Sequence, residues 1–410
     1  MKRRWWIGIL ALGVLAVMES NPHGHTPIAS RWNFNEHLYP VFRDRCSSCH
    51  VEGGIAPMSL LDYRSTFPWA QSIREEVLGL RMPPWQAEDG FGDFKNGHAL
   101  TAAEMDMILE WSAGGYPQGP LAKTPTSDTS VTGWTLGEPA LLLEIPDGFL
   151  LDANTSETIR YFVLPSGLSE ERVLIGAEFK PDARAVVRGA AIFVDSTGAA
   201  RALDDSDTDS GFGQTDEQNF PTDPPVAVWT PGQSSVLNEA GGYLVPPGAD
   251  IVVRVHYKKT WITEGSEFSD KSQVGLHFAD GEAATIESIL VSSPSVNTGD
   301  PIIFTHDFDT DITVLALFPE VDIESSQLQV EGVTPAGKRI PMLWLREPDT
   351  GWPTRYWFNT PIVLPAGSQI EVKAVLDPAA QRLRKSTLLG DDTAPIRFSI
   401  EYVSGLMTAD

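Results

Sequence analysis

The sequence is poor in cysteine and in basic residues. It has 2 cysteines among 410 residues, and its 30 lysines and arginines are outnumbered by 55 acidic residues, giving a formal net charge of −25. This charge argues against a nucleic acid or an anionic membrane surface as a partner. A P-loop, a dinucleotide-binding fingerprint and a Ser-His-Asp order are also missing from the sequence. Few chemical motifs are left, and the two cysteines belong to one of them.

Both cysteines lie in the stretch Cys46-Ser47-Ser48-Cys49-His50. Two thiols three positions apart, followed directly by an imidazole, form the attachment signature of a c-type haem. The thiols add to the two vinyl groups of the porphyrin, and the histidine becomes an axial ligand of the iron. A zinc site needs more thiolates or suitably spaced histidines, and a CxxC redox pair needs a βαβ context. The stretch therefore predicts haem c bound covalently at Cys46 and Cys49, with His50 on the iron.

A second axial ligand is predicted downstream, in Arg81-Met82-Pro83-Pro84-Trp85. A methionine thioether is a common sixth ligand of c-type haem and raises its reduction potential. The two prolines fix an extended backbone after Met82 and can hold its sulfur over the haem. Met58 is the alternative ligand, and a packing role is the alternative for both methionines.

The N-terminal segment, residues 1–22, has the pattern of a signal peptide. Lys2-Arg3-Arg4 forms a basic region, and the apolar run from Trp5 to Met18 is short for a membrane span. The pattern predicts export to a periplasmic or extracytoplasmic location. The alternative is an uncleaved inner-membrane anchor, which would be the protein's contact with the membrane.

Residues 32–118 are predicted to form a small all-α haem domain. Apolar residues recur at helical spacing over 35–45 and 69–80. Thr101 and Glu104 form a capping box that opens a third helix, ended by Gly114-Gly115. Residues 119–133 are rich in Pro, Gly, Ser and Thr and are predicted to be a linker.

From Trp134 onward, short apolar or alternating runs separated by turn residues predict two tandem all-β sandwiches, 134–281 and 282–404. The predicted strands are 140–145, 158–164, 172–179, 185–194 and 250–257 in the first, and 283–291, 302–304, 312–318, 326–332, 339–345, 362–364, 369–376 and 396–402 in the second.

This order of motifs resembles a bacterial group in which a small cytochrome c precedes a module similar to copper type II, ascorbate-dependent monooxygenases of the peptidylglycine hydroxylating class. The resemblance rests on the haem motif and on Trp134-Thr-Leu-Gly-Glu-Pro139, Tyr161-Phe-Val-Leu-Pro165, Val253-Arg-Val-His-Tyr257 and Ala316-Leu-Phe-Pro319. It implies two jelly-roll-like domains, each with a copper site, and hydroxylation of a C–H bond with dioxygen.

Most of the copper ligands that the resemblance implies are missing. Arg188 and Gly189 stand where the family has a His-His pair, and His256 keeps the third ligand of that site. Glu320 and Asp322 replace the His-x-His pair of the second site, and the expected methionine has no counterpart around 391–396. These positions are therefore vestigial, and we expect no functional dicopper centre, because Cu(I) and Cu(II) need imidazole and thioether ligands. The two carboxylates suit a harder cation such as Ca²⁺, Mg²⁺ or Mn²⁺, or else form a solvated or salt-bridged pair.

One further run of carboxylates, Asp205, Asp207 and Asp209, resembles the start of a calcium loop. The following glycine comes one position late for an EF-hand, and an acidic surface loop is the alternative.

Two functions follow from the sequence. The favoured one is a mono-haem electron-transfer protein or redox-complex subunit, with no catalytic residues of its own, whose β module docks or scaffolds the haem domain. Its partner would be a redox protein. The alternative is a metal-dependent monooxygenase or oxidoreductase in which the haem supplies electrons to a site in the β module.

Overall fold

The computed structural model describes most of the chain outside the N-terminal segment. The predicted signal segment lies outside the described residues, as do residues 126–132 of the predicted linker. The described residues are 29–95, 97–125, 133–146, 148–213, 220, 223–294, 301–322, 325–348, 351–376, 388–389 and 394–405.

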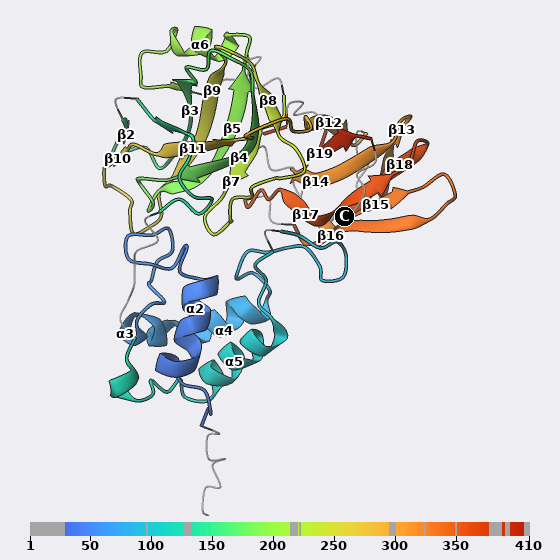
Figure 1. Ribbon diagram of the computed structural model, residues 1–410. Coiled ribbons are helices and arrows are strands. Elements are labelled where there is room, and N and C mark those ends of the chain that lie inside the picture. Colours follow the sequence, from blue (N-terminus) through green and yellow to red (C-terminus); the bar gives the residue numbers. More distant parts are fainter. Residues whose placement is uncertain are drawn as a thin grey trace, which may run out of the picture.

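The N-terminal part forms a small helical unit (Figure 1). Its core is aromatic: Trp111 and Phe34 are almost fully buried, and Phe42 packs against both of them. The predicted capping box is confirmed, since Thr101 and Glu104 each accept from the other's backbone N–H. The helices are η1 (Phe34–Leu38), α2 (Tyr39–Arg45), α3 (Tyr63–Thr66), η2 (Phe67–Trp69), α4 (Ala70–Leu78), α5 (Ala102–Ala113) and η3 (Leu121–Lys123).

The first β-sandwich pairs a five-stranded sheet, in the order β6-β3-β9-β5-β7, with a four-stranded sheet, β1-β11-β4-β8. The two sheets share one apolar core, which includes Phe162 and Val253 from the first and Leu174 and Leu276 from the second. A two-stranded ribbon and helix α6 (Ala199–Asp204) complete this part. The strands are β1 (Leu141–Glu144), β2 (Phe149–Leu151), β3 (Glu157–Pro165), β4 (Arg172–Lys180), β5 (Val187–Asp195), β6 (Phe212–Gly213), β7 (Ala227–Trp229), β8 (Tyr243–Val245), β9 (Asp250–Lys258), β10 (Phe268–Asp270) and β11 (Gln273–Phe278).

The second sandwich pairs the sheets β12-β19-β14-β17 and β13-β18-β15-β16, all with antiparallel neighbours. Its core joins residues of both sheets, such as Leu317 and Phe398 with Val330 and Val372. The strands are β12 (Glu287–Ser292), β13 (Ile302–Phe308), β14 (Ile312–Val321), β15 (Ser325–Val333), β16 (Arg339–Arg346), β17 (Tyr356–Leu364), β18 (Ser368–Leu376) and β19 (Ile396–Ser404).

The structure differs from the sequence prediction at several strands. The short strands β2, β6, β7, β8 and β10 were not predicted, and β13 extends four residues beyond its predicted end. Strand β11 was not predicted, because Gly275 and His277 interrupt its apolar pattern; it forms by pairing between β1 and β4. Strand β17 begins at Tyr356, six residues before the predicted start. Strand β12 starts later than predicted, because Thr285 forms an isolated bridge with Gly242 of the first sandwich.

Direct contacts connect the three parts. The loop between α4 and α5 pairs with one edge strand of each sheet of the second sandwich, through Ala87 with Leu345 on β16 and Phe94 with Phe358 on β17 (Figure 1). Arg355, which is 3% exposed, donates from Nη1 to the carbonyl of Val226 in the first sandwich at 2.9 Å. Loop pairing and a buried arginine thus fix the helical unit and the two sandwiches against each other. Among the described residues, no helix is long and apolar enough to cross a membrane.

Candidate functional site

The Cys46–His50 stretch forms a tight turn at the end of α2. The N–H of Cys46 bonds to the carbonyl of Phe42 at 3.0 Å, and the N–H of His50 returns to the carbonyl of Cys46 at 2.9 Å. Because Val41 and Phe42 are buried in the helical core, α2 anchors the turn rigidly. The two thiols and the imidazole are therefore held close together by this one turn.

A cavity of about 290 Å³ adjoins this turn. Both thiols and the His50 ring border it, and most of the other lining side chains are apolar, such as Leu60, Ile73 and Ile108. An apolar cavity with two thiols and an imidazole at its edge fits a porphyrin that is attached through thioethers and ligated from the same turn. The residues present fit haem c.

The thiols themselves do not have the properties of a redox pair. Burial raises the pKa of Cys46 to about 12 and also raises the pKa of Cys49. Cysteines that exchange disulfides have lowered pKa values, since the thiolate is the reactive form. The CxxC redox alternative is therefore disfavoured.

The His50 ring is oriented by the main chain. Its Nδ1 lies 3.3 Å from the carbonyl oxygen of Met58, and burial lowers the pKa of the imidazole, which favours the neutral form. A backbone bond at Nδ1 leaves Nε2 available as a ligand atom. The side chains of Met58, Met82 and His98 all border the same cavity. His98 comes from the loop before α5, and the sequence gave no reason to group it with the haem motif.

The first sandwich contributes to the cavity at Cys46 and Cys49. Gly232 lines it, and a Cβ at this glycine would lie 3.4 Å from both the Cys49 Sγ and the Ser48 Oγ. Its φ of +90° also favours glycine. Arg184 lies close as well, with Nη2 3.4 Å from the carbonyl of Ser48. The attachment turn thus packs directly against the β module.

The three positions that the resemblance assigns to a first, vestigial copper site lie side by side. Gly189 on β5 pairs with His256 on β9, and the register shifts between Val187 and Gly189, so that Arg188 occupies a β-bulge. The His256 Nε2 lies 2.7 Å from Glu157, which also forms an ion pair with Lys258 at 2.8 Å. Burial raises the pKa of Glu157, but these two hydrogen bonds outweigh it and the net shift is downward. One imidazole and an arginine make a poor copper site.

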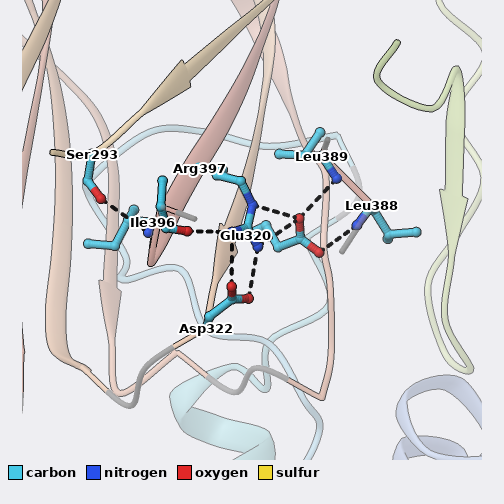
Figure 2. Close-up of polar contacts among 8 residues, drawn as sticks. Ser293, Glu320, Asp322, Leu388, Leu389, Ile396 and Arg397 are labelled. Carbon is cyan, nitrogen blue, oxygen red and sulfur yellow. Dashed lines mark hydrogen bonds and ion pairs between the residues drawn. The ribbon is translucent and has the colours of Figure 1, made fainter. Parts of the chain in front are cut away.

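At the second vestigial site, Glu320 and Asp322 are bound by a fully buried arginine (Figure 2). Arg397 donates from Nη2 and Nη1 to the two oxygens of Asp322 at 2.8 and 2.9 Å, and its Nε lies 3.3 Å from Glu320. Glu320 also accepts backbone N–H bonds from Leu388 and Leu389, at 2.8 and 3.0 Å. Of the two sequence-based alternatives, the structure has the salt-bridged pair. Burial raises the pKa of Glu320 although Arg397 opposes the shift.

The two vestigial sites face one cavity of about 670 Å³. Arg188 and His256 line it from the first sandwich, and Glu320 and Asp322 line it from the second. Gln86 of the helical unit reaches the same space. The cavity therefore lies where the three parts of the chain meet.

The acidic run predicted as a calcium loop lies just after α6. Asp207 accepts backbone N–H bonds from Asp209 and Gly213, at 3.0 and 3.1 Å, and lies 3.4 Å from Arg160. Within the described ranges, no three His, Cys, Asp or Glu side chains gather as a group that could hold a metal ion. Calcium binding stays a prediction.

Arg397 is the main site residue that the sequence analysis missed. It stands among apolar neighbours in Ile396-Arg397-Phe398, and a charged residue at an inward position of a strand is the available signal, because arginine is rarely buried without a partner. His98 and Gly232 carry no comparable local signal.

Comparison with known proteins finds no matching family model and no matching curated protein. Among solved structures, the VP2 subviral particle of infectious bursal disease virus matches with a TM-score of 0.16 and 11% identity, over 65% of this chain and 77% of that chain. A tandem CBM22 domain from Paenibacillus barcinonensis matches with a TM-score of 0.14 and 11% identity, over 67% of this chain and 99% of that chain. Likeness at this level supports no argument about function.

Proposed function

We propose that the chain is an exported mono-haem c-type cytochrome that transfers electrons, alone or as a subunit of a redox complex. The helical unit is its cytochrome c domain, and the two sandwiches form a monooxygenase-like, jelly-roll-like module that has lost its copper chemistry and positions the haem. The observation that carries this proposal is the apolar cavity bordered by Cys46, Cys49 and His50, with the imidazole held by a backbone carbonyl.

Each of these side chains has a distinct task. When bound, the haem supplies reversible one-electron transfer at its iron. Cys46 and Cys49 hold the porphyrin, and the neutral His50 presents Nε2 as the proximal ligand. Gly232 and Arg184 keep the first sandwich against the attachment turn. The acidic net charge suits docking onto a basic redox partner.

Metal and haem content test this function. The full chain, produced in a host that attaches c-type haem, should contain one iron per chain in haem that stays bound after denaturation, and no stoichiometric copper. The reason is that only the CxxCH turn combines covalent anchors with a ligand suited to iron. A protein without covalent haem would refute the proposal.

The same measurement of metal content distinguishes the proposed electron transfer from the alternative, oxidoreductase function. The 670 Å³ cavity between the two sandwiches is the one observation that favours an oxidoreductase, in which the haem supplies electrons to a metal in the β module. One or two tightly bound coppers per chain, together with haem, would support that alternative over electron transfer alone.

The sixth ligand is testable by spectroscopy. We expect Met82→Ala to abolish the Met-to-iron absorption band, because Met82 borders the cavity while Met58 bonds through its main chain to the proximal imidazole. Met58→Ala and His98→Ala are the controls, and both should keep the band. If Met58→Ala removes it instead, Met58 is the ligand, and a wild type without the band points to His98.

A further inference from the structure

The 670 Å³ cavity between the sandwiches lies within the size range of small-molecule sites, ~300–1,000 Å³. It is lined by side chains from β3, β5 and β9 on one side and from β14, β16 and β17 on the other. Its position between packed sheets gives it walls that do not depend on a single loop.

The wall from the first sandwich is cationic. Arg188, Arg254 and Lys258 line it, with Glu157 as the carboxylate on the same side. The Glu157 carboxylate already contacts the Lys258 ammonium and the His256 ring. Three cations against one carboxylate leave this wall with an excess of positive charge.

Among the cations of this wall, the Arg188 guanidinium is the one available to bind an anionic ligand. It stands at the bulge of β5, and bulges re-aim a side chain near binding sites. In the described part of the chain no carboxylate forms an ion pair with Arg188, although Glu157 attracts it from a longer distance, and burial lowers the pKa of its guanidinium. A half-buried arginine without a carboxylate partner is costly unless an anion binds to it.

The opposite wall supplies an apolar surface. Its two carboxylates, Glu320 and Asp322, both form ion pairs with Arg397, which compensates one of their two charges. Trp352 and Leu388 also line the cavity.

We infer that this cavity binds a small organic carboxylate. The carboxylate group is held by the Arg188 guanidinium, whose planar fork matches two carboxylate oxygens, and the apolar body lies against Trp352 and Leu388. Lys258 and Arg254 add attraction from the same wall. No described residue lines both this cavity and the one at Cys46 and Cys49, although Arg188 is near enough to Cys49 to influence its pKa.

Direct binding of defined probes tests the site. Fluorine NMR titration of the full-length protein with para-fluorobenzoate should show saturable binding, and para-fluorobenzyl alcohol, which is neutral, should bind at least tenfold more weakly. Hexanoate should compete with para-fluorobenzoate. In Arg188→Gln, the affinity for para-fluorobenzoate should fall roughly tenfold to a hundredfold, as expected when a charge-assisted bidentate contact is removed.

Arg339→Gln is the matched control, because it makes the same charge change at an exposed arginine on β16 outside the cavity, and it should leave the affinity unchanged. Circular dichroism verifies that both variants are folded, and Arg188→Lys, which keeps the charge but not the fork, should bind with intermediate affinity. The inference is overturned if neither carboxylate binds saturably, if the alcohol binds equally well, or if Arg188→Gln binds like the wild type. Binding of inorganic phosphate without either carboxylate would also overturn it.

Discussion

Replacing Arg397 with methionine should lower the free energy of unfolding of the second sandwich by about 3–5 kcal/mol. The side chain of Arg397 is 0% exposed and binds Asp322 and Glu320, which are themselves 7% and 13% exposed. Methionine leaves both carboxylates without the cation that compensates their burial. Denaturant unfolding, followed by tryptophan fluorescence, measures the change.

Arg339→Met is the matched control for this effect. Arg339 also bridges two glutamates, Glu331 and Glu371, but its side chain is 47% exposed. Solvent screens such a pair, so the expected loss is about 0–1 kcal/mol. Equal destabilisation by the two variants would contradict the assignment of Arg397 as a buried charge anchor.

A triple variant distinguishes the contribution of charge compensation to stability from that of side-chain packing. Arg397→Met combined with Glu320→Gln and Asp322→Asn removes the buried charges together, and it should recover part of the stability that Arg397→Met alone loses. No recovery would show that packing of the arginine, and not charge compensation, accounts for the loss.

The double variant Cys46→Ala with Cys49→Ala should carry no covalently attached haem. Both thiols border the cavity, and the chain contains no other cysteine that could form a thioether. Haem staining of the denatured protein is expected to change from positive in the wild type to negative in the variant. The all-or-none size of this effect makes it the most direct test of the attachment site.

Ser47→Ala with Ser48→Ala is the control in the same turn. Neither serine bonds to the His50 ring, and the Ser47 hydroxyl donates to the carbonyl of Arg43 on the adjacent helix. Covalent haem should therefore be retained. Haem that stays on the denatured cysteine variant would mean that another residue forms the link.

The elements of the fold were largely predictable because they depend on local patterns. The capping box at Thr101 and the alternating runs that became β3, β9 and β19 each specify their own helix or strand. Strand β11 was missed, because its sequence is irregular and its conformation is imposed by two neighbours. Prediction from sequence therefore fails where pairing with neighbouring strands overrides the local conformational preference of a segment.

The sequence by itself determined the haem motif, since attachment chemistry needs two thiols and an imidazole within five consecutive residues. It also determined that imidazoles are missing at most of the positions where the resemblance implies copper ligands. Only the tertiary structure showed that Arg397 binds Asp322, 75 residues away. It also showed that Arg184 contacts Ser48 of the Cys46–His50 turn, 136 residues away. The cavity lined by Arg188 likewise needs three parts of the chain. Contacts of this kind come from packing between sheets, which no local pattern of residues encodes.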